Sequence, residues 1–197
     1  QSNFDNIKES IQEIPVQDLI NYNNEKVGNL LHAAVLNNKG QVTHNDVATI
    51  LIEHIAASVE TEDNLKRNWF NQKNDRGDSP IHYAATIGCD KIITTLRETQ
   101  LGVNFDIENK NGSRAVHLAA KSGHINVLES LKESGANLEA TNDKNRTPAD
   151  LARKSGHSNV SKYLAEAKNL STPSPMISNT TSSATTIFDS QNSDKRR

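Results

Sequence analysis

Seven histidines and one cysteine are the side chains of this 197-residue sequence best suited to acid–base, nucleophilic or metal chemistry. Their spacing does not favour such chemistry, because the sequence contains no His-Glu-x-x-His, Cys-x-x-Cys or Gly-x-Ser-x-Gly motif and no phosphate-binding glycine loop. Cys89 has no convincing base beside it, and we expect a small buried or half-buried thiol. The carboxylates Glu60, Glu62 and Asp63 lie in a polar stretch that favours a solvated loop. We therefore expect no enzyme, no cofactor and no metal.

The histidines instead mark a repeat. The segment Ser79-Pro-Ile-His-Tyr-Ala-Ala returns at residues 114–120 and, with Asp150 in place of the histidine, at residues 147–152. The steps are 117 − 82 = 35 and 150 − 117 = 33 residues. A glycine follows each of these positions after six residues, at Gly88, Gly123 and Gly156. A period of this length indicates a stacked helical array, so these residues are expected to build a scaffold.

Each copy contains the signals of two short helices. Ser79 and Thr147 are suitable N-cap residues, and the prolines that follow them suit the first helical position. The glycines predict left-handed helix ends, and a second aliphatic helix follows each one. Its apolar residues in the three copies are Ile92, Ile93, Leu96, Val127, Leu128, Leu131, Val160, Tyr163 and Leu164.

A degenerate earlier copy begins at residues 24–34, with His32 in the repeated position. Its distance from His82 is 82 − 32 = 50 residues, so about 17 residues are inserted. We place them at residues 39–44 and roughly 57–67, on either side of a second helix expected at residues 45–56.

The two ends of the sequence differ from the repeats. Phe4, Ile7, Ile11 and Ile14 have helical spacing, and we interpret residues 1–20 as a helical cap for the stack. Residues 167–197 are rich in Ser and Thr and are expected to be a disordered tail, unless its apolar residues dock on the repeats. Those residues are Met176, Ile177, Ile187 and Phe188.

Three features resemble ankyrin repeats. They are the turn and first helix at residues 75–82, the Gly-His pairs at 123–124 and 156–157, and the loop at 135–139. The resemblance covers roughly residues 20–166. It implies an all-α solenoid of about four helix-turn-helix units joined by short hairpin-like turns, at residues 21–70, 71–107, 108–140 and 141–166. A tetratricopeptide-like array lacks the glycine turn before Ser/Thr-Pro and is set aside. In ankyrin repeats, histidines at these repeat positions hydrogen-bond backbone groups of a neighbouring turn. The resemblance therefore implies a structural role for five histidines of this chain: His32, His82, His117, His124 and His157. His44 and His54 are expected at the surface.

The resemblance also implies where a partner would bind, because ankyrin stacks use a concave side made by the turns and the first helices. The corresponding residues are Asp75, Arg76, Asp78, Thr86 and Ile87; Lys110, Asn111, Ser113, Lys121 and Ser122; and Asp143, Lys144, Arg146, Arg153 and Lys154. We treat Thr86/Ile87, Lys121/Ser122 and Arg153/Lys154 as equivalent pairs.

Charge along this set changes from mixed to basic. Residues 110–166 contain nine Lys or Arg against six Asp or Glu, whereas the whole chain has a net charge of −2. We expect a protein or peptide partner, with an acidic stretch near the C-terminal repeats.

Trp69, the one tryptophan, allows two interpretations. It is either an interface residue beside the insertion or a residue that packs the insertion on the second helix, and packing is favoured.

The overall composition excludes several classes. The acidic balance gives no sign of nucleic-acid binding, and no run of about 18 apolar residues could cross a membrane. One cysteine cannot form an intramolecular disulfide, and with no signal-peptide pattern we expect a cytoplasmic monomer. Two alternatives remain: an effector that acts in a host cell, as the resemblance to ankyrin proteins of intracellular bacteria suggests, or the targeting module of a larger enzyme.

Overall fold

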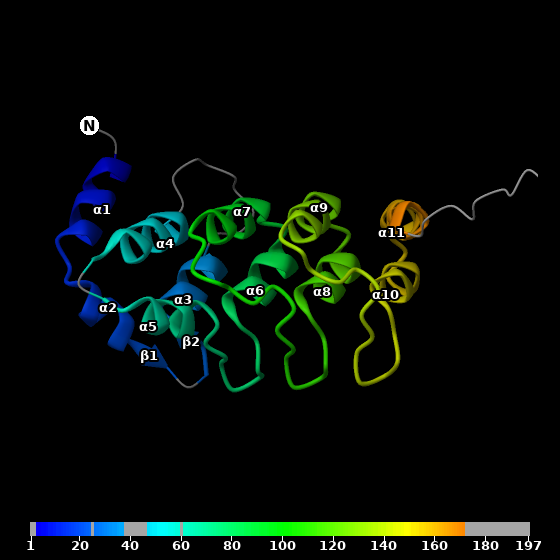
Figure 1. Cartoon of the computed structure of the whole chain (residues 1–197), viewed down its shortest axis with the longest axis horizontal. Helices are drawn as coiled ribbons and strands as arrows, with labels where there is room; N and C mark the ends of the chain where they lie inside the picture. The colour runs from blue at the N-terminus through cyan, green and yellow to red at the C-terminus, as the bar shows by residue number, and fades with distance from the viewer. Residues whose placement is uncertain (1–2, 25, 38–46, 60, 172–197) are drawn as a thin grey trace, which may run out of the picture.

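The repeats form a row of stacked helix pairs in the computed structural model, which describes residues 3–24, 26–37, 47–59 and 61–171 (Figure 1). The first helices of the units are α3 (Leu30–Asn37), α6 (Pro80–Ile87), α8 (Ala115–Ser122) and α10 (Pro148–Lys154). The second helices are α4 (Val47–Ala57), α7 (Asp90–Glu98), α9 (Ile125–Glu133) and α11 (Ser158–Ser171). The turns before the first helices project from one side of the row as parallel fingers (Figure 1). The expected all-α ankyrin-type solenoid is thus confirmed.

Two short helices, α1 (Asn3–Gln12) and α2 (Val16–Asn21), lie at the N-terminal end of the row (Figure 1). Pro15 directly precedes α2, and Leu19 of α2 is buried in the core shared with the first unit. The first turn contains an antiparallel pair of two-residue strands, β1 (Asn23–Asn24) and β2 (Gly28–Asn29), in which Asn23 is opposite Asn29.

The insertion in the first unit differs from the polar loop expected at residues 57–67. Residues Asp63–Phe70 form a further helix, α5, whose buried face consists of Lys66, Trp69 and Phe70. The Lys66 ammonium donates hydrogen bonds to the carbonyls of Ala56 and Ser58 at the end of α4, so it satisfies acceptors that a helix end leaves open. Polar residues make up most of this segment, and the three buried positions at helical spacing are the signal that sequence reasoning missed. The other inserted segment, residues 39–44, lies outside the described residues.

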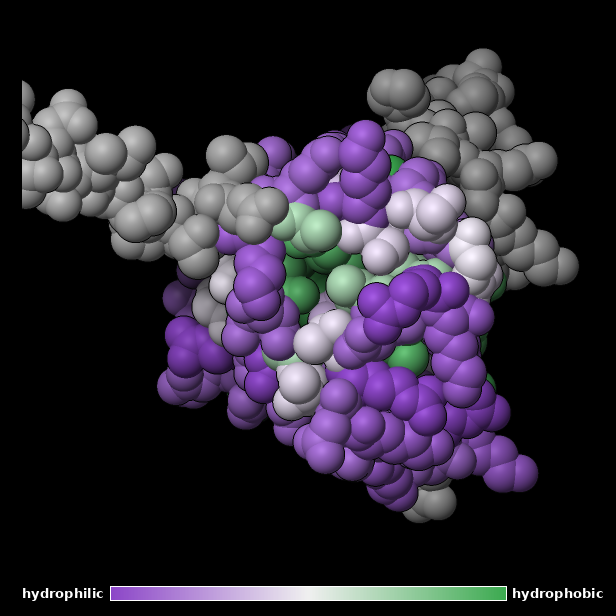
Figure 2. Space-filling view, turned by 90° about the vertical axis from the view of Figure 1, so that its right-hand side faces the viewer, coloured by the Kyte–Doolittle hydropathy of each residue, from purple (hydrophilic) through white to green (hydrophobic). Residues whose placement is uncertain are grey.

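The core is a continuous strip of small and aliphatic side chains. The alanine pairs of α6 and α8, at positions 84, 85, 119 and 120, are fully buried, which allows neighbouring first helices to approach closely. The predicted aliphatic positions of α7 and α9 are buried as well. The view onto the α10–α11 end shows a hydrophilic rim around apolar side chains gathered at the centre of the end face (Figure 2).

Glycines end the first helices and admit a histidine ring. Gly123 has φ +86°, and a Cβ placed on it would lie 2.8 Å from Nδ1 of His157. Gly88 stands in the same relation to His124. A glycine is therefore required at these positions for two reasons. It adopts the left-handed backbone without strain, and it leaves room for the histidine ring of the next repeat.

The last unit is built as an end. At the position occupied by the fully buried Ala85 and Ala120, it carries Arg153, whose side chain is 72% exposed. In place of the histidine it has Asp150, which forms a reciprocal capping box with Thr147. Helix α11 continues to Ser171, five residues beyond the boundary expected at residue 166. The rest of the expected tail, from residue 172, lies outside the described residues.

Candidate protein-binding groove

An asparagine shapes each of the four turns. The side-chain oxygen of Asn142 accepts hydrogen bonds from the backbone N–H groups of Lys144 and Arg146, at 3.0 and 3.2 Å. Asn24, Asn74 and Asn109 make the corresponding bonds in the earlier turns. Sequence reasoning missed these residues, although they follow the same 50, 35 and 33 residue steps as the histidine position. Each turn tip is therefore held by its own side chain.

Histidines then tie each turn to the preceding first helix. Nε2 of His32 lies 3.0 Å from the carbonyl of Asp78, Nε2 of His82 lies 3.0 Å from that of Ser113, and Nε2 of His117 lies 3.1 Å from that of Arg146. In each case Nδ1 accepts a backbone N–H from the start of its own helix. In His82 and His117, Nε2 then carries the proton, so these two rings are neutral donors. Nδ1 of His32 also lies 2.7 Å from Oδ1 of Asn29.

Burial lowers the pKa of His32, His82 and His117. Both ring nitrogens are already used, which leaves no lone pair for a metal or a substrate. Among the described residues, no group of three or more His, Cys, Asp or Glu side chains is placed to hold a metal ion.

The predicted groove residues of the second unit have mixed roles. Asp75 and Arg76 are exposed at the turn, whereas Asp78 accepts a hydrogen bond from Nδ2 of Asn109 at 2.8 Å. Thr86 donates to the His82 carbonyl of its own helix, and Ile87 packs against the core.

Six of the fifteen predicted residues line one hollow of about 420 Å³ between the third and fourth units. We call it the basic hollow, and it is lined by Asn109, Asn111, Ser113, Leu118, Lys121, Asn142, Lys144, Arg146, Leu151, Lys154 and Ser155. The predicted residues Lys110, Ser122, Asp143 and Arg153 lie outside this lining. The basic hollow thus unites side chains from two turns and the ends of two first helices that the sequence separates by up to 155 − 109 = 46 residues.

The helix register corrects one predicted equivalence. Lys121 lies two residues before Gly123, the left-handed glycine that ends α8. In the fourth unit, the residue two positions before the corresponding Gly156 is Lys154. The pair equivalent to Lys121/Ser122 is therefore Lys154/Ser155, and not Arg153/Lys154. Arg153 pairs instead with Asp150 at 2.6 Å. The error arose because Gly156, rather than the preceding charged pair, sets the register.

The charge of the basic hollow is uncompensated within the described part of the chain. Its four cations, Lys121, Lys144, Arg146 and Lys154, take part in none of the ion pairs there, and no carboxylate lines it. Some cations elsewhere on the stack are paired, as Arg114 is with Asp106 and Glu108.

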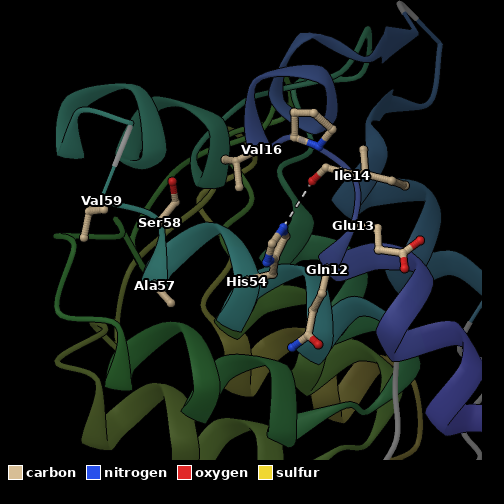
Figure 3. Close-up of a pocket in the computed structure, with 9 residues that line it drawn as sticks. Gln12, Glu13, Ile14, Val16, His54, Ala57, Ser58 and Val59 are labelled. Atoms are coloured by element: carbon tan, nitrogen blue, oxygen red, sulfur yellow. Dashed lines mark hydrogen bonds between the residues drawn. The ribbon is translucent and has the colours of Figure 1, made fainter.

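A second hollow, of about 470 Å³, lies between the α1–α2 junction and the end of α4 (Figure 3). His54 points into it and its Nε2 contacts the carbonyl of Ile14 at 3.3 Å. The expectation of a surface position for His54 agrees with its partial exposure, whereas His44 lies outside the described residues. Glu13 is the one carboxylate in this lining, so the hollow has little chemistry to select a ligand.

Trp69 is 3% exposed and meets Phe70 edge to face, with ring centroids 5.5 Å apart. Its carbonyl accepts a hydrogen bond from the side chain of Asn29, which fixes α5 to the first turn. The packing interpretation is the correct one. Cys89 is buried, as expected. No helix in the described residues is long and apolar enough to cross a membrane.

Comparison with known proteins agrees with this architecture. Residues 98–173 match the family model for ankyrin repeats in three copies. The NF-kappa-B inhibitor cactus of Drosophila yakuba is 39% identical over 56 residues, which are 28% of this chain and 12% of that protein. The p105 subunit of nuclear factor NF-kappa-B from Gallus gallus is 27% identical over 142 residues, 71% of this chain and 13% of that protein. The chain thus spans a small fraction of these much longer relatives. Taken with the four turn–helix–helix units, the family match identifies ankyrin repeats over residues 98–173, and repeats of this family form a protein-interaction fold.

Proposed function

We propose that this protein binds a partner protein or peptide along the concave side, and that an acidic stretch of the partner lies against the third and fourth repeats. The observation that carries the proposal is the basic hollow, in which four unpaired cations from two repeats share one lining. Such uncompensated charge attracts an acidic partner and speeds its encounter.

Binding rather than catalysis is the function that this geometry supports. The histidines at the groove are neutral and occupied by structural hydrogen bonds, so they offer no free base. The turns that carry the exposed side chains are fixed by asparagine and histidine bonds, and a fixed surface loses little conformational entropy when a partner binds.

The test is site-specific photo-cross-linking of the full chain in extracts of the producing cells. A photoreactive residue is placed at Asn111 or Ser122 on the concave side, and at Asn126 or Glu129 on α9 as the matched control. We expect discrete partner adducts from the concave positions and not from α9. Adducts that form equally from α9, or that form only there, would overturn the proposal.

A further inference from the structure

We propose that the basic hollow is an anchor for two adjacent negative charges on an extended segment of the partner, with an apolar side chain next to them. This inference rests on the proposed function and specifies the chemistry that the partner must present. An Asp or Glu pair and a single phosphorylated serine or threonine both supply that charge.

The first step is the polarity of the lining. Lys144 and Arg146 come from the fourth turn, and Lys121 and Lys154 come from the last turns of α8 and α10. The lining also includes Leu118, which is half-buried, and Leu151, which is buried at its edge. Four positive charges are better matched by two negative charges than by one, and the leucines offer a contact to one apolar neighbour.

The second step is that no carboxylate of the described chain lines the hollow to balance its four cations. Asp143 precedes Lys144, but its side chain lies against Gly112 at the tip of the preceding turn. Asp150 is bound to Thr147 and Arg153, and the hydrogen bond from the Thr147 backbone N–H lowers the pKa of its carboxyl group. Of the two carboxylates nearest in sequence, Asp150 is thus committed to other partners and Asp143 faces the preceding turn.

The third step is that the charge is concentrated at one junction. One repeat earlier, the positions equivalent to Lys121, Lys144 and Arg146 are Thr86, Asn111 and Ser113, by 121 − 86 = 35, 144 − 111 = 33 and 146 − 113 = 33. That junction also contains Asp78, which is bound to Asn109. Lys154 and Asn111 correspond there to Lys121 and Arg76, by 154 − 121 = 33 and 111 − 76 = 35. Two cations and a carboxylate thus stand where the last junction has four cations, so the basic charge is concentrated at the last junction.

This localisation selects among anionic partners. A nucleic-acid strand presents a phosphate at every nucleotide and needs a basic stripe, and a membrane presents a broad charged plane. Neither matches one basic hollow in a chain of net charge −2. A short acidic motif does.

The hollow is also fixed before any ligand arrives. The fourth turn is joined to the third by the hydrogen bond from the Asp143 N–H to the Asn111 carbonyl, at 3.2 Å. His117 holds the Arg146 carbonyl from the α8 side at 3.1 Å. The backbone that carries Lys144 and Arg146 is therefore ordered by the repeat itself.

The experiment measures fluorescence anisotropy of labelled peptides with the full chain. The probes are a peptide with a central Glu-Glu-Leu, its phosphoserine-Leu and Gln-Gln-Leu counterparts, and a version in which glycines separate the two glutamates. An oligothymidine strand and vesicles containing phosphatidylserine are the competing anions. We expect the adjacent-charge peptides to bind about tenfold more tightly than the neutral and separated versions. The ratio between the Glu-Glu and phosphoserine probes identifies the source of the charge.

The matched variants carry the same change in net charge. Lys144→Glu with Lys154→Glu should weaken binding of the adjacent-charge peptides about tenfold or more. Lys91→Glu with Lys132→Glu, at exposed positions of α7 and α9 away from the groove, should change it less than about twofold. Circular dichroism melting of both variants separates lost binding from lost folding. Should Lys154→Glu unfold the last repeat, Lys144→Gln on the exposed turn repeats the test without reversing a charge.

Three results would overturn the inference: equal binding of the Gln-Gln-Leu peptide, equal loss in the control variant, or tighter binding of the oligothymidine or the vesicles. Cross-linking to the concave side that survives Lys144→Glu with Lys154→Glu would also reject it and leave the proposed function standing. Cross-linking from α9 alone would reject the proposed function instead.

Discussion

Nε2 of His117 in the third repeat donates a hydrogen bond to the backbone carbonyl of Arg146 in the fourth, across 3.1 Å. This one bond connects the scaffold to the basic hollow, because Arg146 lines the hollow while His117 lies fully buried behind it. The residue that gives the repeat its recognisable sequence thus positions a residue that varies from repeat to repeat.

The buried histidines should make the stability of the stack depend on pH. His32, His82 and His117 have lowered pKa values in the folded state because of burial, so below pH of about 6.5 the unfolded chain binds more protons than the folded chain. The free energy of unfolding should be level above that pH and should fall below it, by up to about 1.4 kcal/mol per pH unit for each histidine. Urea denaturation at a series of pH values measures this slope.

In His117→Gln, the dependence of the unfolding free energy on pH should lose the contribution of one histidine. The overall stability should also fall, because the Arg146 carbonyl loses its donor. A wild-type stability that stays level or rises between pH 6.5 and the acid transition would contradict this account.

Gly123→Ala should destabilise the protein more than Gly156→Ala. Both glycines have a positive φ, +86° and +81°, so both variants carry the cost of a left-handed alanine, about 1 kcal/mol. Only at Gly123 would the new Cβ also meet the ring of His157, at 2.8 Å, whereas nothing lies within 4 Å at Gly156. Thermal melts of the two variants should differ by about 1–3 kcal/mol in stability. Equal losses would show that the ring moves freely.

Lys66→Met should destabilise the first unit although it adds an apolar side chain to a buried site. The ammonium of Lys66 satisfies the Ala56 and Ser58 carbonyls, and its removal leaves these acceptors without their donor. We expect a loss of about 2–3 kcal/mol in chemical denaturation. Lys132→Met, at an exposed position of α9, is the control and should change stability by less than about 0.5 kcal/mol. A neutral Lys66→Met would show that water replaces the ammonium.

Trp69 should report on the first unit by fluorescence. Its side chain is 3% exposed and packs against Phe70, so the folded protein should emit at shorter wavelength than the unfolded chain. Lys66→Met should shift the emission towards the unfolded value at lower denaturant than in the wild type. Emission that already resembles exposed tryptophan in the native protein would contradict the packing of α5.

Much of the scaffold could be predicted from the sequence because its determinants are local. Ser79, Pro80 and Gly88 fix the start and the end of one helix through backbone geometry alone, and their recurrence at fixed steps reveals the stack. The structural role of the histidines followed from the same register. Local signals of this kind need no knowledge of what lies on the far side of a helix.

The parts that sequence reasoning missed depend on contacts between distant residues. Lys66 looked like a member of a polar loop because its burial depends on the end of α4, eight to ten residues away. Arg153 looked equivalent to Lys121, but its position corresponds to the buried Ala120 and is exposed because no further helix in the described chain covers it.

The same division holds for the candidate site. The sequence by itself determined the repeat, its register and the excess of basic residues in the C-terminal half, since these depend on residue type and spacing. Only the tertiary structure decided that Lys121, Lys144, Arg146 and Lys154 share one hollow while Lys110 and Arg153 do not. Stacking brings turns 33 residues apart into contact, and which side chains then face one another depends on helix rotation rather than on order along the chain.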